Sequence, residues 1–195
     1  MKEIILASNN KNKLRELKDK LKKFDINIIS QKEAGFDIEV EETGKTFSEN
    51  AKLKAEKIYE LAKQPVIADD SGLEIDYLNG KPGVYSHRFA GPDATDKDRN
   101  NKILKLMENV EDEKRTARFK CAICYIDING EVRIFEGCVE GKITRKEIGN
   151  NNFGYDPIFM YGEKTFAQMT QDEKSEISHR GLAMKKFINF LTSNW

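Results

Sequence analysis

Side chains that could bind a flat, charged ligand gather in the C-terminal part of this 195-residue sequence. The segment Phe153-Gly154-Tyr155-Asp156-Pro157 is followed by Lys174, His179 and Arg180. An aromatic ring can stack on a heterocycle, a carboxylate and an imidazole can read its edge, and an amine and a guanidinium can hold an anionic tail. This combination of residue types predicts a nucleotide site.

The pair His179-Arg180 indicates which bases such a site would accept. Both side chains donate hydrogen bonds at an expected helix start, so they would suit the carbonyl of a 6-oxo purine and not the amino group of adenine. The alternative is an ordinary helix cap with surface charges. Phe153 could likewise be a core aromatic, although its place beside Asp156-Pro157 favours a rigid stacking edge.

A second polar set, Ser8-Asn9-Asn10-Lys11-Asn12-Lys13, lies near the N-terminus. It joins an apolar run, a strand candidate, to an expected helix. Free backbone N–H groups at a helix start attract phosphate, and the polar side chains and Lys13 add donors and charge. The glycines of a Walker A loop or a dinucleotide turn are absent. The alternative is an ordinary asparagine-rich turn.

Acidic residues suited to a divalent cation lie between these two sets. Asp69-Asp70-Ser71-Gly72 comes just after a short strand candidate, where ligands bind in open α/β sheets. Side chains alternate along a strand, so only one of the two aspartates is expected to enter the site. Glu42 and Asp70 could form a partial cage for Mg²⁺, which takes one or two carboxylates together with phosphate oxygens.

Lys54 shares a helical face with Asn50 and could point at the same phosphates. Each of these residues also has an ordinary interpretation. Asp69-Asp70 could be a solvated turn, Glu42 could belong to an acidic loop that favours a helix N-terminus, and Lys54 could simply be solvated.

The elements expected around these residues begin with strand, helix and strand, which favours a parallel pair with a right-handed crossover. A long hairpin around Asn129-Gly130 comes later. The order fits an α/β protein with a mixed sheet, whose hairpin could form a second lobe beside a cleft. The expected helices are 13–24, 46–63, 96–109 and 178–191, and the expected strands are 3–7, 27–30, 66–68, 116–128 and 131–139, with a possible extension to 144.

The bulk composition argues against several classes. Lys plus Arg and Asp plus Glu both number 33, so the basic bias of a nucleic-acid or membrane-surface binder is absent. No apolar run approaches the roughly 18 residues of a membrane helix. Three cysteines and no export signal predict reduced thiols in the cytosol. Cys121 and Cys124 lie three apart in an expected strand and so point to opposite faces, which favours buried structural residues over a metal pair.

Together, and in this order, the motifs resemble the inosine triphosphate pyrophosphatase family, which hydrolyses deaminated purine nucleoside triphosphates. Any one motif is weak, whereas the ordered set spans nearly the whole chain and is specific. Ser8-Asn9 departs from the Thr-Gly of many bacterial relatives. The matching segments are Ser8-x-Asn10-x-x-Lys13, Glu42-Thr43-Gly44-x-Thr46-Phe47-x-Glu49-Asn50-Ala51-x-x-Lys54-Ala55, Ala68-Asp69-Asp70-Ser71-Gly72-Leu73, Pro82-Gly83-x-Tyr85-Ser86, Phe153-Gly154-Tyr155-Asp156-Pro157, Glu173-Lys174-Ser175 and Ser178-His179-Arg180-Gly181.

The resemblance implies one domain over residues 1–195 with an elongated α/β fold, in which two lobes flank a central nucleotide-binding cleft. It implies a cytoplasmic homodimer. It also implies Mg²⁺-dependent conversion of ITP, dITP or XTP to the monophosphate and pyrophosphate. It implies that the loop from Ser8 to Lys13 and Lys54 bind phosphates. It implies that Glu42 and Asp70 hold the metal and that Asp70 accepts a proton. It also implies that Phe153 stacks on the base, that Asp156, His179 and Arg180 read it, and that Lys174 helps to orient it. The other expected substrate-binding residues are Ser71, Gly154 and Tyr155.

Three alternatives remain at this stage. A nucleotide sensor without turnover would not need the acids Glu42 and Asp70. A nucleic-acid-binding module would use the basic and aromatic residues, which the zero net charge disfavours. A pyrophosphatase for modified pyrimidine nucleotides would differ in its substrates alone.

Overall fold

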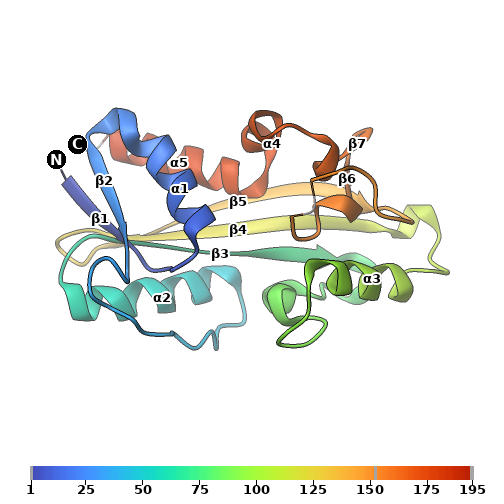
Figure 1. Cartoon of the computed structure of the whole chain (residues 1–195), viewed down its shortest axis with the longest axis horizontal. Helices are drawn as coiled ribbons and strands as arrows, with labels where there is room; N and C mark the ends of the chain where they lie inside the picture. The colour runs from blue at the N-terminus through green and yellow to red at the C-terminus, as the bar shows by residue number, and fades with distance from the viewer. Residues whose placement is uncertain (1, 152, 194–195) are drawn as a thin grey trace. The chain divides into compact units, whose positions relative to one another are not determined.

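The computed structural model describes residues 2–151 and 153–193 and shows an α/β chain (Figure 1). The helices are α1 (Lys11–Leu21), α2 (Phe47–Ala62), α3 (Asp96–Leu106), α4 (Gln171–Ile177) and α5 (His179–Ser193). The strands are β1 (Lys2–Leu6), β2 (Ile26–Ser30), β3 (Val66–Ile75), β4 (Thr116–Ile126), β5 (Val132–Ile143), β6 (Phe159–Tyr161) and β7 (Lys164–Thr165).

The described strands form one mixed sheet in the order β2-β1-β3-β4-β5-β6-β7. Strand β1 pairs in parallel with β2 and with β3, while the short strands β6 and β7 pair antiparallel. The expected mixed α/β fold and the parallel opening pair are therefore confirmed. Three long strands (β3, β4 and β5) and helix α5 contribute residues to both of the compact units into which the chain divides.

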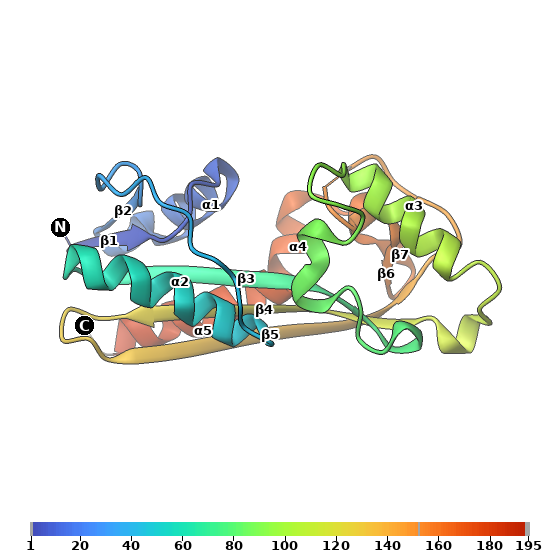
Figure 2. The same ribbon diagram turned by 90° about the horizontal axis from the view of Figure 1, so that it is seen from below.

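The first unit comprises Met1–Asp70, Ala122–Glu136 and Met184–Trp195. Its apolar strand residues are buried because helices pack on them; α1 packs against β2, and α2 runs alongside the start of β3 (Figure 2). Helix α2 begins where the Thr46 side chain accepts a hydrogen bond from the Glu49 N–H. The Glu49 carboxylate accepts a hydrogen bond from the Lys45 N–H and not from the Thr46 N–H, so only one of the two contacts of a capping box forms.

The second unit comprises Ser71–Cys121 and Gly137–Ala183. A group of aromatic rings lies within its core, where Phe119 is 4.5 Å from Phe159 and 5.8 Å from Phe166 between ring centroids. Gly137 in β5 is required by a close approach, because a Cβ there would lie 2.0 Å from the His179 carbonyl oxygen. Strand β5 and the start of helix α5 therefore pack backbone against backbone.

One sequence expectation about the elements was wrong, and helix α4 and the short strands β6 and β7 were not predicted. Strand β3 does not end at Ala68 but continues to Ile75, so Asp69-Asp70-Ser71-Gly72 lies within a strand and not after it. Helix α4 was not expected, although Thr170 and Glu173 form a full capping box at its start. The remaining helices and long strands were placed correctly to within a few residues.

Candidate active site

Asp69 and Asp70, neighbours in β3, meet side chains from two different helices. Asp69 is buried and lies 2.9 Å from the Lys13 ammonium on α1. Asp70 accepts a hydrogen bond of 3.1 Å from the Asn50 amide on α2. Strand alternation separates the two carboxylates in this way, as expected from the sequence. Asp70 is therefore the aspartate that shares surroundings with Lys54.

The Lys54 ammonium lies close to two carboxylates. Its Nζ is 2.6 Å from Glu42 Oε1 and 3.7 Å from Asp70 Oδ1. Burial alone would lower the Lys54 pKa, but Asp70, Asp69 and Glu42 outweigh burial and raise it. Burial raises the Asp70 pKa, Lys54 opposes that shift, and repulsion from Glu42 adds to it. The arrangement concentrates negative charge around one cation.

Asn50 connects the acidic loop to Asp70, a role that the sequence did not reveal. Its side chain is completely buried, and its Oδ1 accepts a hydrogen bond of 2.8 Å from the Gly44 N–H. A Cβ on Gly44 would lie 2.6 Å from that oxygen, so the close approach requires glycine. The Asn50 amide group therefore orients Asp70 while its oxygen fixes the loop that carries Glu42. The sequence signal for this role was Gly44, a glycine that shortly precedes the capped helix α2.

The loop from Ser8 to Lys13 joins β1 to the first turn of α1, as expected. The Asn10 side chain accepts from the Lys13 N–H at 3.2 Å, and Ser8 Oγ accepts from the Asn10 N–H at 3.1 Å. One N–H of the first turn is thus already occupied by a side chain. Asn9, Asn10 and Lys11 are exposed, and the side chain of Asn12 lies outside the described part of the structure.

Three of the expected base-site residues meet in the second unit. The Lys174 ammonium forms an ion pair with Asp156 and lies 5.0 Å from the centroid of the Phe153 ring. Phe153 is 48% exposed, so its ring has a face available for stacking. Asp156 is only 3% exposed; burial raises the pKa of its carboxyl group, and Lys174 opposes that shift.

His179 and Arg180 occupy the first turn of α5 in the same unit. The His179 ring stacks on Phe119 at 4.7 Å between centroids, and Arg180 Nη2 lies 3.4 Å from Ser71 Oγ. Gly181 is needed here because a Cβ would lie 1.8 Å from the Ser175 carbonyl oxygen of α4. Helices α4 and α5 therefore approach each other closely at this point.

Tyr155 is the expected site residue whose side chain turns into the core. It is buried among the apolar residues of the second unit, and its hydroxyl donates a hydrogen bond of 2.6 Å to the Ser86 carbonyl. Burial raises the pKa of this phenol above its ordinary value. Its side chain therefore anchors the segment from Phe153 to Asp156, and a ligand contact would have to use its backbone.

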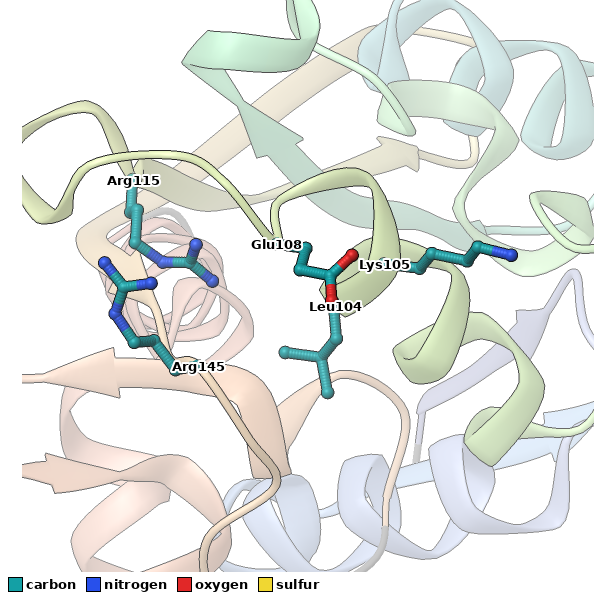
Figure 3. A pocket seen from close by; sticks show the side chains of 5 residues that line it. All are labelled: Leu104, Lys105, Glu108, Arg115 and Arg145. Atoms are coloured by element: carbon teal, nitrogen blue, oxygen red, sulfur yellow. The ribbon is translucent and has the colours of Figure 1, made fainter.

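A pocket elsewhere in the second unit is lined by charged side chains (Figure 3). It has a volume of about 450 Å³ and is lined by Leu104, Lys105, Glu108, Arg115 and Arg145. The buried Arg115 guanidinium donates to the Ile143 and Thr144 carbonyls at 2.8 and 2.6 Å, and Arg145 pairs with Asp112 at 2.7 Å. These two guanidinium groups thus tie neighbouring segments together, and we assign the pocket no ligand.

Other features bear on the classes considered from the sequence. Within residues 2–151 and 153–193, no cluster of three or more His, Cys, Asp or Glu residues is arranged to hold a metal ion. Cys121 and Cys124 are buried in β4, as expected, and no disulfide joins the three cysteines, all of which are described. No helix in the described part of the chain is long and apolar enough to cross a membrane.

Comparison with known proteins places this fold and these residues in one family. The model of the Ham1 family matches residues 4–190. A dITP/XTP pyrophosphatase of Clostridium perfringens is 52% identical over 194 residues, covering 95% of each chain, and that of Bacillus subtilis is 46% identical over 193 residues, covering 98% of each. The structure of the Staphylococcus aureus Ham1 protein superimposes with a TM-score of 0.93, with 41% identity and complete coverage of both chains.

The chain belongs to the Ham1 family. The family prediction made from the ordered motifs is therefore confirmed, because the match extends over nearly the whole chain. The roles of the individual site residues remain predictions.

Proposed function

We propose that this protein hydrolyses non-standard purine nucleoside triphosphates, namely ITP, dITP and XTP, to the monophosphate and pyrophosphate. Relatives that are 46% and 52% identical over nearly their whole length are named dITP/XTP pyrophosphatase, which supports the reaction and the substrate class. The structural observation that carries the proposal is the pair of carboxylates, Glu42 and Asp70, that lie 2.6 and 3.7 Å from the Lys54 ammonium.

The same observation supports a magnesium requirement. Two carboxylates that already share one cation match the preference of Mg²⁺ for hard oxygen ligands, with phosphate oxygens and water completing its shell. Glu42 and Asp70 would hold the ion. When bound, Mg²⁺ would neutralise charge on the triphosphate and on the departing pyrophosphate.

The chain's own residues would handle the phosphates and the attacking water. Lys54, Lys13 and the amides of the loop from Ser8 to Lys13 would bind the triphosphate and stabilise the leaving pyrophosphate. Asp70 would orient water and accept its proton as the water attacks the α-phosphorus. No covalent intermediate is needed.

The residues of the second unit would recognise the base. Phe153 would stack on the purine, and the Asp156 carboxylate, held by Lys174, would accept the N1–H that a 6-oxo purine carries and adenine lacks. Arg180 and His179 would donate to the 6-oxygen, and Ser71 and the backbone of the Phe153 segment would contact the nucleotide. The proposal also includes a cytoplasmic homodimer that acts as one domain over residues 1–195.

A substrate panel tests this function against the alternatives. Pyrophosphate release is measured from ITP, dITP, XTP, GTP, ATP and a set of modified pyrimidine triphosphates, each with Mg²⁺ and with EDTA. Rapid Mg²⁺-dependent release from ITP, dITP and XTP, with little from ATP or GTP, is expected. Guanine shares the 6-oxygen, so discrimination against GTP must involve the 2-position. Tight ITP binding without release would favour a sensor, and preference for a pyrimidine would replace the substrate class.

A further inference from the structure

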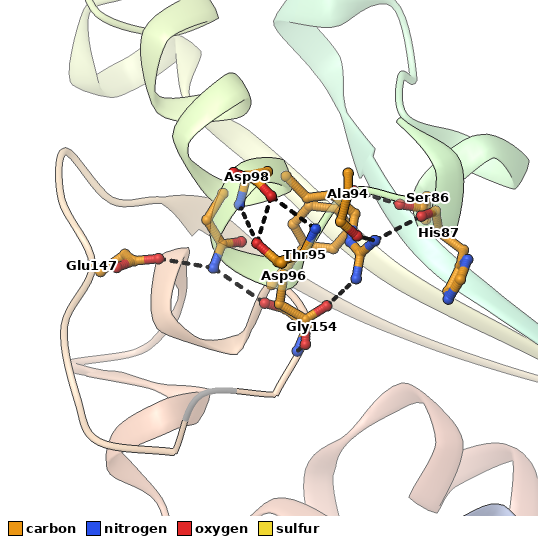
Figure 4. A network of polar contacts seen from close by, with 11 residues as sticks. Ser86, His87, Ala94, Thr95, Asp96, Asp98, Glu147 and Gly154 are labelled. Atoms are coloured by element: carbon orange, nitrogen blue, oxygen red, sulfur yellow. Dashed lines mark hydrogen bonds and ion pairs between the residues drawn. The ribbon is translucent and has the colours of Figure 1, made fainter. Parts of the chain in front are cut away.

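Two side chains of helix α3 hold the backbone of Gly154, one at its N–H and the other at its carbonyl (Figure 4). Asp96 Oδ2 accepts a hydrogen bond of 2.8 Å from the Gly154 N–H, and Asn100 Nδ2 donates one of 3.2 Å to the Gly154 carbonyl. The two residues lie four apart on one face of the helix, so a single rigid element fixes both groups. We call this pair of contacts the Gly154 clamp.

The clamp affects the site because Gly154 lies between residues expected to bind the base. Gly154 has a left-handed backbone conformation, with φ of +57°, and it separates Phe153 from Tyr155 and Asp156. A turn of this kind sets the direction in which the flanking side chains leave the chain. With Tyr155 tied to the Ser86 carbonyl, the clamp fixes where the exposed Phe153 ring and the buried Asp156 carboxylate lie.

Further contacts hold Asp96 itself in place. Its second oxygen pairs with Arg99, which is buried and whose guanidinium donates to the His87 and Ala94 carbonyls at 2.9 and 2.6 Å. A capping box of Thr95 and Asp98 fixes the first turn of α3. Asp96 is therefore oriented before any ligand arrives, as a positioning residue requires.

Within the described residues, the buried side chain of Asn100 has an unpaired polar atom, which core packing alone would not select. It is 2% exposed, and its Oδ1 has no hydrogen-bond partner in the described part of the chain, while its Nδ2 serves Gly154 and Glu147. A buried polar atom left unsatisfied destabilises a fold. Such local costs are expected where a residue serves the site and not the core.

We propose that Asp96 and Asn100 are positioning residues that set base selectivity by holding the backbone N–H and carbonyl of Gly154. The inference rests on the proposed function, since it assigns these residues to recognition of the purine by Phe153 and Asp156. Loss of one clamp contact should raise KM for ITP and narrow the ratio of kcat/KM for ITP over ATP by about 10-fold, the effect of one hydrogen bond. The value of kcat should change less.

The test compares Asp96→Ala and Asn100→Ala with Asp98→Ala. Asp98 belongs to the capping box and does not contact Gly154, so its loss weakens the helix start alone. Two readouts are taken: kcat and KM for ITP and ATP, and hydrogen exchange of the Gly154 amide in the ligand-free protein. Both clamp variants are expected to lose selectivity, and Asp96→Ala to lose Gly154 protection, whereas Asp98→Ala keeps both and lowers only Tm.

A conservative variant supplies a rescue. Asp96→Asn keeps an oxygen that can accept the Gly154 N–H, so it should retain more selectivity than Asp96→Ala. If Asp96→Ala fails to fold, Asn100→Ala still carries the selectivity test, because it removes the contact with the Gly154 carbonyl. Clamp variants with the selectivity and exchange of Asp98→Ala would overturn the inference. Failure of the proposed function is distinguishable, because the wild-type protein would then release no pyrophosphate from ITP while the exchange measurement still reports on the clamp.

Discussion

Lys54 Nζ lies 2.6 Å from Glu42 Oε1 and 3.7 Å from Asp70 Oδ1. The ammonium therefore compensates two carboxylates that would otherwise repel each other at short range. Because Mg²⁺ would be held by the same two carboxylates, the internal cation and the metal act on one charge cluster. The free energy of unfolding and its increase on Mg²⁺ binding should therefore both depend on Lys54.

Lys54→Met should make folding more dependent on Mg²⁺. In EDTA, the variant leaves two half-buried carboxylates without their cation, which should cost about 2 kcal/mol of the free energy of unfolding. Saturating Mg²⁺ should recover much of that loss by binding the folded state. Urea unfolding with Mg²⁺ and with EDTA measures both effects. Lys52→Met, which removes an exposed pair with Glu56 on the same helix, is the control. Equal Mg²⁺ stabilisation of both variants would contradict the linkage.

Asp70→Asn should separate turnover from folding. Loss of a proton acceptor should lower kcat about 10²- to 10⁴-fold with little change in ITP affinity. Burial raises the pKa of Asp70 in the folded protein. Ionisation of this carboxyl group therefore lowers the free energy of unfolding as pH rises from the pKa of the unfolded chain through the pKa of the folded protein. The neutral amide avoids that cost, so Tm at neutral pH should not drop. Near-normal turnover would remove Asp70 from its proposed role.

Phe153→Ala should weaken substrate binding without destabilising the protein. Stacking of a base on an aromatic ring contributes about 1–3 kcal/mol, so KM for ITP should rise about 5- to 150-fold. Phe153 is about half exposed, and its truncation should change the free energy of unfolding by only about 0.5 kcal/mol. Phe153→Tyr keeps the ring and should behave almost as the wild type. An unchanged KM for the alanine variant would rule out stacking.

Arg180→Ala should narrow the preference for ITP over ATP. The change removes a proposed donor to the 6-oxygen, which only the 6-oxo purines present, and should cost about tenfold in the ratio of kcat/KM values. Lys185→Ala removes an exposed charge from the same helix and serves as the control. If both variants show the wild-type ratio, Arg180 does not read the base.

Base binding should depend on pH through Asp156. Burial raises the pKa of this carboxyl group, and protonation would remove the proposed acceptor for the purine N1–H. Affinity for IMP should therefore be highest above the raised pKa of Asp156 and should fall as pH decreases through that pKa. The fall should occur at a pH above about 4, the ordinary carboxyl pKa. Titration calorimetry over a pH series measures this. Asp156→Asn should bind weakly with a flat profile; a wild-type profile that is flat down to about pH 4 would contradict the assignment.

The sequence predicted the elements whose apolar pattern is local. The opening strand, helix and strand were found because their buried residues repeat at strand and helix spacing. The end of β3 was misplaced because its apolar run stops at Ala68, whereas Asp69 and Asp70 continue the strand with Lys13 and Asn50 as polar partners. Helix α4 is short and exposed, so its capping box was the only local signal.

The contacts that assemble the candidate site depend on tertiary structure. Lys54 and Glu42 are 12 residues apart, and Asp96 and Gly154 are 58 apart. A local pattern can show that such residues are suitable, but not that they meet. The ordered motifs predicted the residue types, whereas only the fold shows which residues meet: the Lys54 ammonium with two carboxylates, and the Gly154 backbone with α3.

The position of bond cleavage tests the proposed reaction most directly. ITP is hydrolysed with Mg²⁺ in water enriched in ¹⁸O, and the products are separated and weighed by mass spectrometry. Attack of water on the α-phosphorus predicts IMP that carries one labelled oxygen and unlabelled pyrophosphate. Label in the pyrophosphate, or formation of IDP and labelled phosphate, would contradict the account.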